Sequence, residues 1–272
     1  MSPRGGGRGA VAAVSPRGSG GVAPVHSAPM PEATPAVDKR PEAIQAMFGR
    51  VAPVYDLLNH LLSGSLDRVW RKRAARAMTA RQAAHLARLP ALDLCCGTGD
   101  QAIALHQRGA RVAAADFCLP MVAIARRKFQ RLRAPVPAPL VADALVLPFP
   151  TAAFRAATVS FGLRNVVDLD GALAELARVL TPDGHLFVLE FALPRVQPLR
   201  GAYLLYFRRL LPAIGRRVSG DSSAYSYLPS SVLEFPQRRE FVERMAAAGF
   251  VDGGWEDLAG GIVCLYTGRK PT

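Results

Sequence analysis

The chain has 272 residues, is 50% hydrophobic and carries a formal net charge of +13 at pH 7. This length and composition favour one folded domain and exclude a membrane-spanning helix, because arginine or proline interrupts each long apolar segment. The positive charge suits a nucleic acid or an anionic membrane surface as partner. Arginines spread over helix-like segments such as 68–76 and 126–133 equally fit a solvated helix face.

Residues 1–40 are rich in glycine, alanine, proline and serine, and no acidic residue precedes Glu32. No apolar periodicity runs through them, so we expect a disordered tail. Two other interpretations stay open, a transit peptide and a translation start at Met30. We expect a cytoplasmic protein, with peripheral contact at the inner membrane as an open alternative.

The folded domain is expected to cover residues 41–272. Residues 41–80 have apolar residues at three- and four-residue spacing, which predicts a cap of short helices. Strand-like and helix-like stretches then alternate, and this predicts an α/β fold with an open, doubly wound, mostly parallel sheet. The strand-like stretches are 91–96, 111–116, 139–144, 157–161 and 185–191, and the helix-like stretches begin near Asp100 and cover 119–133 and 168–180.

The C-terminal part departs from this alternation. A segment rich in tyrosine, leucine and arginine (200–217) precedes a serine- and tyrosine-rich stretch (219–231) that is expected to be a loop. A helix over 237–248 and two strands, 250–256 and 262–267, are predicted to close the chain. Strands this close in sequence are expected to pair antiparallel.

The stretch ALDLCCGTGD places two cysteines before a glycine turn. Cys95, Cys96, Cys118 and Cys264 form no C-x-x-C pair and lie in apolar, strand-like surroundings, which predicts reduced, buried thiols. Successive side chains on a strand point to opposite faces, so Cys95 and Cys96 are not expected to face one metal ion. We predict neither a disulfide framework nor a metal site.

Gly97, Thr98 and Gly99 form a turn where the backbone can approach a ligand at the start of the next helix. The pattern is weak evidence alone, because nucleotide-binding proteins, S-adenosylmethionine-binding proteins and plain tight turns all match it. Asp93 and Asp100 flank the turn and would repel a pyrophosphate. S-adenosylmethionine carries an ammonium and a sulfonium and no phosphate, so we predict it as the cofactor.

Further polar residues stand at the ends of the following strands. In an open parallel sheet, ligands bind outside the carboxyl ends of the strands where the strand order reverses. Asp116 suits two ribose hydroxyls, Asp143 and Ala144 suit an adenine, and Ser160 is expected to face the same crevice. Each has an ordinary structural explanation as well, such as a strand-end cap for Asp116, so the prediction depends on the whole set.

Between about residues 44 and 271 the chain contains YDLLN, LDLCCGTGD, ADALVLPFP, SFGLRN, AYSYLPSSVLEFP and GGIVCLYTGRKP. Together these stretches resemble the quinone-ring C-methyltransferases of menaquinone and ubiquinone biosynthesis. YDLLN and SFGLRN are specific to that family, whereas the glycine turn is common to methyltransferases. The resemblance implies the Rossmann-like fold of class I methyltransferases, with an N-terminal helical cap and an antiparallel C-terminal strand.

By matching position, the resemblance implies cofactor contacts at Thr98, Asp116, Asp143, Ala144 and Ser160. It also implies that Arg164, Asn165 and Tyr55 are the catalytic residues on the substrate side. The double cysteine and the segment near residue 200 resemble the menaquinone branch more than the ubiquinone branch. The expected reaction is therefore the conversion of demethylmenaquinol to menaquinol, with a ubiquinone-pathway benzoquinol, or both substrates, as the alternative.

Methylation at a ring carbon needs an electron-rich quinol, and negative charge develops on its oxygen. Arg164 is expected to stabilise that oxyanion, with a structural role toward loop carbonyls as the alternative. No histidine has a carboxylate partner in the sequence, so no general base is predicted. Residues 200–235 are expected to face the substrate and an anionic membrane surface through a basic amphipathic segment, with a core-packing helix as the alternative.

Three rival functions remain at this stage. A nucleic-acid methyltransferase is disfavoured because SFGLRN stands where a D/N-P-P-Y loop is expected and no Pro-Cys nucleophile occurs. The acids at the turn disfavour an NAD-dependent oxidoreductase. A basic RNA-binding module without catalysis predicts salt-sensitive RNA binding. We expect no nucleic-acid partner, and an oligomer stays open.

Overall fold

The computed structural model describes residues 38–82, 90–132, 136–206, 209 and 223–272. All of these belong to one unit, Pro35–Thr272. The predicted tail, residues 1–40, lies outside the described residues apart from 38–40, so its interpretation stays a prediction. No helix in the described part of the chain is long and apolar enough to cross a membrane.

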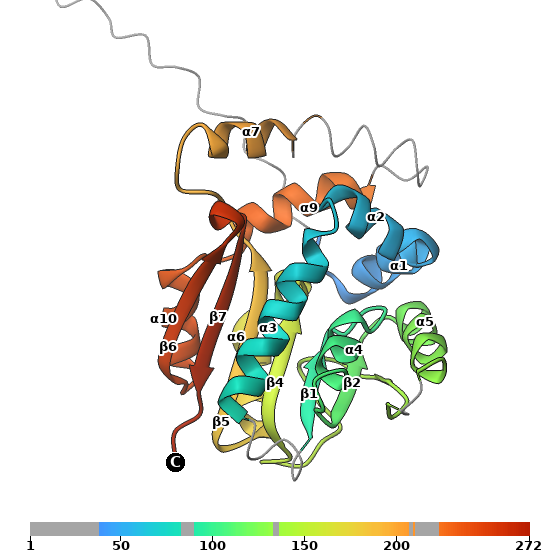
Figure 1. The fold of residues 1–272 in the computed structure, drawn as a ribbon, viewed down its shortest axis with the longest axis vertical. Helices are drawn as coiled ribbons and strands as arrows, with labels where there is room; N and C mark the ends of the chain where they lie inside the picture. The colour runs from blue at the N-terminus through green and yellow to red at the C-terminus, as the bar shows by residue number, and fades with distance from the viewer. Residues whose placement is uncertain (1–37, 83–89, 133–135, 207–208, 210–222) are drawn as a thin grey trace, which may run out of the picture. The chain divides into compact units, whose positions relative to one another are not determined.

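A seven-stranded sheet forms the centre of the fold (Figure 1), in the order β3-β2-β1-β4-β5-β7-β6. Strands β1 to β5 pair in parallel, and β7 pairs antiparallel with both β5 and β6. The predicted mostly parallel sheet with one antiparallel C-terminal strand is confirmed. The strands are β1 (Ala91–Leu94), β2 (Val112–Asp116), β3 (Leu140–Val141), β4 (Phe154–Ser160), β5 (Leu180–Phe191), β6 (Val251–Leu258) and β7 (Val263–Arg269).

Strand β1 is the point where the strand order reverses. Its residues Ala91–Leu94 pair with Val112–Ala115 of β2 on one side and with Ala156–Val159 of β4 on the other. The loops that leave β1 and β4 at their carboxyl ends therefore diverge and leave a crevice between them. This crevice holds the site described below.

Helices cover both faces of the sheet (Figure 1). Helices α3, α4 and α5 pack on one face, and α6 and α10 pack on the other. The helices are α1 (Pro41–Val51), η1 (Ala52–Val54), α2 (Tyr55–Leu62), α3 (Leu66–Gln82), α4 (Asp100–His106), α5 (Leu119–Gln130), η2 (Leu163–Asn165), α6 (Leu169–Val179), α7 (Leu199–Leu205), α9 (Ser223–Glu234), α10 (Arg239–Ala247) and η4 (Ala259–Gly261).

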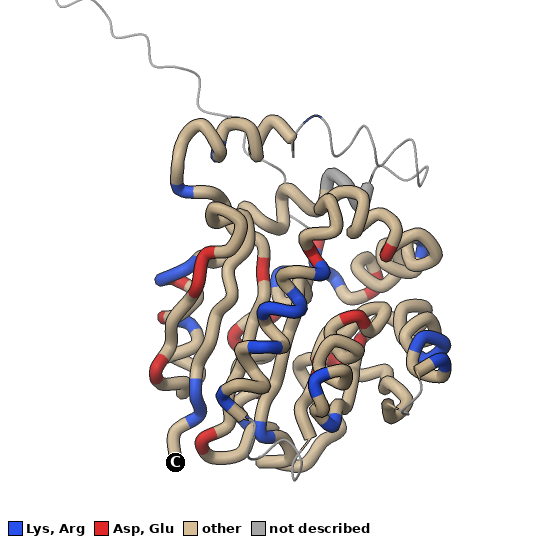
Figure 2. Tube along the Cα trace, in the orientation of Figure 1, with Lys and Arg blue, Asp and Glu red and all other residues tan. Residues whose placement is uncertain are grey.

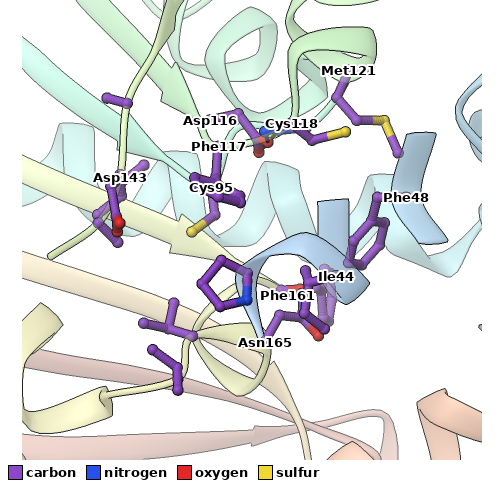
Figure 3. Close-up of a pocket in the computed structure, with 18 of the residues that line it drawn as sticks. Ile44, Phe48, Cys95, Asp116, Phe117, Cys118, Met121, Asp143, Phe161 and Asn165 are labelled. Carbon is purple, nitrogen blue, oxygen red and sulfur yellow. Dashed lines mark hydrogen bonds between the residues drawn. The ribbon is translucent and has the colours of Figure 1, made fainter. Parts of the chain in front are cut away.

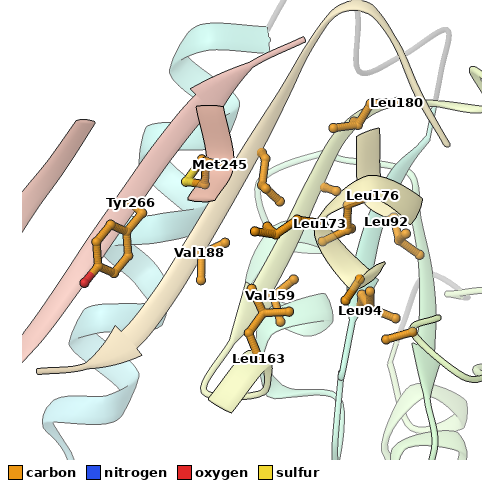
Figure 4. Packing of buried hydrophobic residues seen from close by; sticks show 14 of the residues in the cluster. Leu92, Leu94, Val159, Leu163, Leu173, Leu176, Leu180, Val188, Met245 and Tyr266 are labelled. Atoms are coloured by element: carbon orange, nitrogen blue, oxygen red, sulfur yellow. The ribbon is translucent and has the colours of Figure 1, made fainter. Parts of the chain in front are cut away.

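Helix α6 shows how the sequence sets these elements. Asp168 caps its first turn, because a side-chain oxygen accepts a hydrogen bond from the Gly171 backbone N–H at 2.9 Å. Leu173 and Leu176 lie three residues apart and are fully buried, so one stripe of the helix faces the sheet. Figure 4 shows both residues packed against Val159 and Leu92 of the sheet.

Helix α3 is much more basic than helix α6. Basic residues recur along it (Figure 2), yet Trp70, Ala74 and Met78 repeat every four residues and are buried against the sheet. The expectation that the arginines of 68–76 form a solvated face is wrong at one position, Arg71, which is only 8% exposed.

The predicted loop over 219–231 is wrong in its described part. Residues from Ser223 onward form helix α9, which continues to Glu234 and contains Pro229. The serines of this stretch favour turns, so the sequence did not predict this helix. Its side chains Leu228 and Val232 pack with Tyr203 of α7, so tertiary packing favours helix over the local preference.

The segment predicted to form a basic amphipathic surface is only partly described. Leu205 is exposed, but Tyr203 is buried between α7 and α9, which contradicts its expected place on that surface and favours the core-packing alternative there. Packing against Val232 accounts for this burial. Leu204 and Tyr206 are half-buried and Arg209 is exposed, while the members at 207–208 and in 210–217 lie outside the described residues.

Replacement of Leu176 with alanine should lower the free energy of unfolding by about 2–5 kcal/mol, because it leaves a cavity under the sheet. Leu57→Ala is the matched control, since Leu57 is 61% exposed on helix α2. Denaturant unfolding of both variants measures the difference. Equal losses would contradict the assignment of the core.

Candidate functional site

Two adjoining cavities open at the carboxyl ends of the strands. The first chamber encloses about 870 Å³, including some space open to solvent, and is lined by the ends of β1, β2, β3 and β4 together with helix α1. Figure 3 shows Cys95, Asp116, Asp143 and Asn165 around it. Its predicted lining residues are Tyr55, Gly97, Asp116, Asp143, Ala144, Ser160 and Asn165.

The second chamber is larger, at about 1550 Å³ including open space. Helices α1, α2, α3, α7 and α9 surround it, and most of its lining side chains are aliphatic or aromatic. The polar side chains among them include Asn59, Asp67, Arg71, Arg164 and Tyr227. Such a chamber suits a bulky apolar ligand with a small polar end.

Three aromatic residues separate the chambers. Phe48, Tyr55 and Phe161 line both. Phe48 and Tyr55 meet edge to face, with ring centroids 6.1 Å apart. A group held at these rings can therefore contact ligands in both chambers.

The glycine turn has a left-handed backbone, and at Gly99 it also leaves no space for a side chain. Gly97 and Gly99 have φ angles of 54° and 88°. A Cβ atom on Gly99 would lie 2.5 Å from Cε1 of Phe129, so helix α5 packs directly against the turn. The Gly97 backbone N–H donates to Oδ2 of Asp116 at 2.8 Å and joins the ends of β1 and β2.

The two adjacent cysteines lie beyond strand β1, which ends at Leu94. Cys95 has a φ of 54° and is not a strand residue, so strand alternation does not apply to this pair, yet the two thiols have different surroundings: Cys95 lines the first chamber and Cys96 packs in the core. Burial raises the pKa of both thiols well above the usual range, which makes them unreactive. All four cysteines are free, as predicted.

Asp116 lies at the centre of the first chamber. Its two oxygens accept hydrogen bonds from the backbone N–H groups of Gly97 and Cys118, both at 2.8 Å. Burial raises the pKa of the Asp116 carboxyl, and these two donors act in the opposite direction. The carboxylate is thus held in place while each oxygen keeps a lone pair for a ligand.

The other predicted residues of the first chamber differ in exposure. The Asp143 carboxylate is exposed and accepts from the Leu145 N–H at 2.9 Å, which orders the loop around buried Ala144. Ser160 is buried, and its Oγ has no hydrogen-bond partner among the described residues. A buried hydroxyl without a partner at a cavity wall is a candidate ligand contact.

The acids that flank the glycine turn do not both act as the sequence suggests. Asp100 is ion-paired with Lys128 at 2.6 Å, so the idea that its free charge sets the potential of the turn is corrected. Lys128 also pairs with Asp56 of helix α2 at 2.6 Å, and Asp56 accepts a hydrogen bond from Thr98 at 2.5 Å. We call Asp56, Thr98, Asp100 and Lys128 the clasp. It fastens the helical cap to the turn.

Asp93 is buried behind the turn rather than in the lining. One oxygen accepts from Oγ1 of Thr158 at 3.0 Å, and the other, Oδ2, has no hydrogen-bond partner among the described residues. Burial raises the pKa of Asp93 to about 7. Thr98 is also buried outside the two linings. Contacts of Asp93 and Thr98 with a ligand therefore stay predictions.

The predicted catalytic arginine is paired. Arg164 is buried on η2, and its Nη1 lies 3.2 Å from Oε2 of Glu190, which is 0% exposed at the end of β5. The same Nη1 donates to the Phe161 carbonyl. Burial raises the pKa of the Glu190 carboxyl, and Arg164 opposes that rise. The structural alternative considered for Arg164 therefore has direct support, although the residue also lines the second chamber.

Two residues near this pair were missed in the sequence. Glu190 was assigned only to a strand, and Tyr227 only to a loop. The Tyr227 hydroxyl donates to Oδ1 of Asn165 at 2.9 Å and lines the second chamber. The repeated tyrosines of AYSYLPSS were the available signal, but nothing in the sequence places them opposite Asn165.

A histidine with a carboxylate partner exists, which corrects the expectation from the sequence. Nδ1 of His60 lies 3.0 Å from both oxygens of Asp67. The pair joins the end of α2 to the start of α3. The two residues are seven positions apart in the sequence, and only the turn between the helices brings them together. One ligand-type atom from each of His60, Asp67 and Asp100 lies within 4.8 Å of the others. The expected absence of a metal site stays a prediction.

Removal of Arg164 alone should be costly. Arg164→Met leaves Glu190 buried without its cation, so we expect a loss of about 3–5 kcal/mol in the free energy of unfolding. The double variant Arg164→Met/Glu190→Gln should lose less, because neither charge remains. Urea unfolding compares the two, and an equal loss would contradict the ion pair.

The raised pKa of Asp93 predicts a pH dependence of stability. The folded protein keeps this proton up to about pH 7, whereas an unfolded aspartate releases it at about pH 4. Stability from this group is therefore present below pH 4 and is lost as the pH rises toward 7. In urea unfolding, the free energy of unfolding of Asp93→Asn should rise relative to that of the wild type between about pH 4 and 7. A difference between the two that does not change with pH would contradict the raised pKa of Asp93.

The comparisons with known proteins agree with this architecture. Among solved structures, the [4+2]-cyclase SpnF matches with a TM-score of 0.60 and 20% identity over 85% of this chain and 97% of its own. A Thermotoga maritima S-adenosylmethionine-dependent methyltransferase, described as a possible histamine N-methyltransferase, matches with a TM-score of 0.56 and 17% identity over 84% and 99%. At these identities the likeness shows the fold alone, that of class I methyltransferases.

Sequence relatives are closer. Demethylmenaquinone methyltransferase of Thermus thermophilus is 46% identical over 83% of this chain and 100% of its own length. The Streptomyces avermitilis enzyme of the same name is 41% identical over 86% and 97%. The ubiquinone/menaquinone biosynthesis C-methyltransferase UbiE of Citrifermentans bemidjiense is 41% identical over 86% and 99%. Residues 36–270 match the ubiE/COQ5 methyltransferase family, and the chain belongs to that family.

Proposed function

We propose that this protein transfers a methyl group from S-adenosylmethionine to a ring carbon of a prenylated quinol, converting demethylmenaquinol to menaquinol. The observation that carries the proposal is the pair of adjoining chambers. One presents the carboxylate and glycine turn that suit a nucleoside amino acid. The other is large and mostly apolar, as a prenylated ring requires.

The residues of the first chamber fit the proposed cofactor. Asp116 has lone pairs available for two ribose hydroxyls, and the loop with Asp143 and Ala144 suits the adenine. Ser160 offers a buried hydroxyl that lacks a partner among the described residues. Gly97 keeps the wall free of side-chain atoms where the ligand would pass.

When bound, S-adenosylmethionine supplies an electrophilic methyl group on a positively charged sulfur. The protein must then hold the quinol ring in line with that methyl group, and such positioning alone is worth several kcal/mol. Tyr55, at the wall between the chambers, is the residue we assign to this alignment. Asn165 lines the first chamber and accepts a hydrogen bond from Tyr227 of the second, and we assign it to orienting the substrate through that contact.

A second substrate, the benzoquinol of the ubiquinone pathway, stays a candidate because a relative with 41% identity is named for both pathways. The relatives named for demethylmenaquinone favour the naphthoquinol. The second chamber has room for either ring.

Contact with an anionic membrane surface is part of the proposal, because the prenyl tail of the substrate resides in a bilayer. Leu57, Leu61, Leu66 and Val69 are exposed on helices α2 and α3, which line the second chamber, and basic Arg68 and Lys72 are exposed beside them. An apolar surface with cationic neighbours suits peripheral binding.

The test uses the purified full-length chain with methyl-labelled S-adenosylmethionine. Reduced demethylmenaquinol and its benzoquinol counterpart are presented in vesicles with or without anionic lipid. We expect label in the menaquinol product, with a higher rate on anionic vesicles. Label in neither product would contradict the proposed function, and label only in the benzoquinol product would assign the alternative substrate.

A further inference from the structure

Arg71 is a buried cation without a hydrogen-bonded partner among the described residues. It lies in the second turn of helix α3, its side chain is 10% exposed, and its Nε is enclosed with no acceptor among the described residues. Burying a charge without a hydrogen-bonded partner is costly. At a chamber wall, such a group is a candidate contact for a ligand.

The neighbouring carboxylates do not satisfy Arg71. The nearest, Asp67, has an oxygen 4.0 Å from Nε, beyond hydrogen-bond distance. Asp67 already accepts hydrogen bonds from His60 and from Oγ of Ser63 at 2.9 Å. Asp93 is close enough for Arg71 to oppose the rise of its pKa, but no hydrogen bond joins them.

Arg71 is positioned at the junction of the two chambers. Its guanidinium carbon lies 5.4 Å from the centroid of the Phe161 ring, and Phe161 lines both chambers. Arg71 itself lines the second chamber. The proposed methyl transfer requires the two ligands to meet at this wall.

Arg164 provides the contrast within the same chamber. Its guanidinium also lies 5.4 Å from a ring centroid, that of Phe191, and Phe191 packs 4.6 Å from Phe161. The Nε of Arg164 also lacks a hydrogen-bond partner among the described residues, but its Nη1 is paired with Glu190 and donates to a loop carbonyl, whereas no hydrogen bond to a described residue satisfies Arg71. Of the two arginines, Arg71 keeps the larger unmet capacity to bind an oxygen anion.

We propose that Arg71 binds a ring oxygen of the quinol and stabilises the negative charge that this oxygen carries when its hydroxyl proton is released for methylation. This inference rests on the proposed function. It assigns to Arg71 the stabilisation of the quinol oxyanion that the sequence analysis expects of Arg164. Guanidinium groups suit this part because they donate several hydrogen bonds and keep their charge.

The step balances without a further reactant. The quinol hydroxyl releases its proton to solvent as electron density from the oxygen drives the adjacent ring carbon to form the new carbon–carbon bond. The carbon–sulfur bond breaks with its electron pair on sulfur. The methylated ring carbon then loses its hydrogen as a proton, and the oxygen regains one, so that one proton is released overall.

The test compares Arg71→Met, Arg71→Lys and the control Arg76→Met in the full-length chain. Arg76 is exposed on the same helix, so its variant loses the same charge from α3 without reaching the chambers. We expect Arg71→Met to lower kcat by about 10²–10³, the usual effect of removing one oxyanion donor. Its KM for demethylmenaquinol should change less than tenfold, and Arg71→Lys should recover at least tenfold in kcat.

Two further measurements separate this role from a structural one. The melting temperature of Arg71→Met should not fall below that of Arg76→Met, and the Kd for S-adenosylmethionine should be the same in both variants within error. Two results would overturn the inference, provided that the wild type methylates: a kcat of Arg71→Met within threefold of the wild-type value, or a loss of S-adenosylmethionine affinity in Arg71→Met as large as its loss of kcat. A wild type that methylates neither quinol would instead overturn the proposed function.

Discussion

The packing of Phe161 is the contact on which the site depends. Its backbone N–H donates to the Leu189 carbonyl at 2.7 Å, which continues the sheet one residue beyond β4. Its carbonyl accepts from Arg164, and its ring packs against Phe191 and lies beneath Arg71. One residue thus joins the sheet, both buried arginines and the wall between the chambers.

The carboxylates near this wall are buried, and their burial is the main cause of their shifted pKa values. Asp93, Asp116 and Glu190 all stand near strand ends, and burial raises the pKa of each. The protein offsets these costs differently, with backbone donors at Asp116 and a guanidinium at Glu190. Ser160 and Arg71 are among the buried groups without a hydrogen-bond partner in the described residues, and because each lines a chamber, both are candidate ligand contacts.

The sequence was informative where a single strand or helix determines the outcome. The alternation of strands and helices predicted the sheet, and the residues at strand ends led to Asp116, Ala144 and Ser160 in one chamber. It failed where two distant segments decide. Nothing local shows that Glu190 reaches Arg164, that Lys128 neutralises Asp100, or that packing makes α9 a helix. Arg71 could not be distinguished from its exposed neighbours on α3, because no local sequence pattern shows that a charged residue is buried.

The aromatic wall has an energetic consequence. Since Phe48, Tyr55 and Phe161 line both chambers, an occupant of one that reorients these rings also reshapes the other. Linkage makes such an effect reciprocal, so each ligand changes the affinity for its partner by the same factor. The clasp between Thr98 and Asp56 extends this coupling to the cap itself. The coupling between the two ligands is then a property of the rings and the clasp, rather than of either chamber alone.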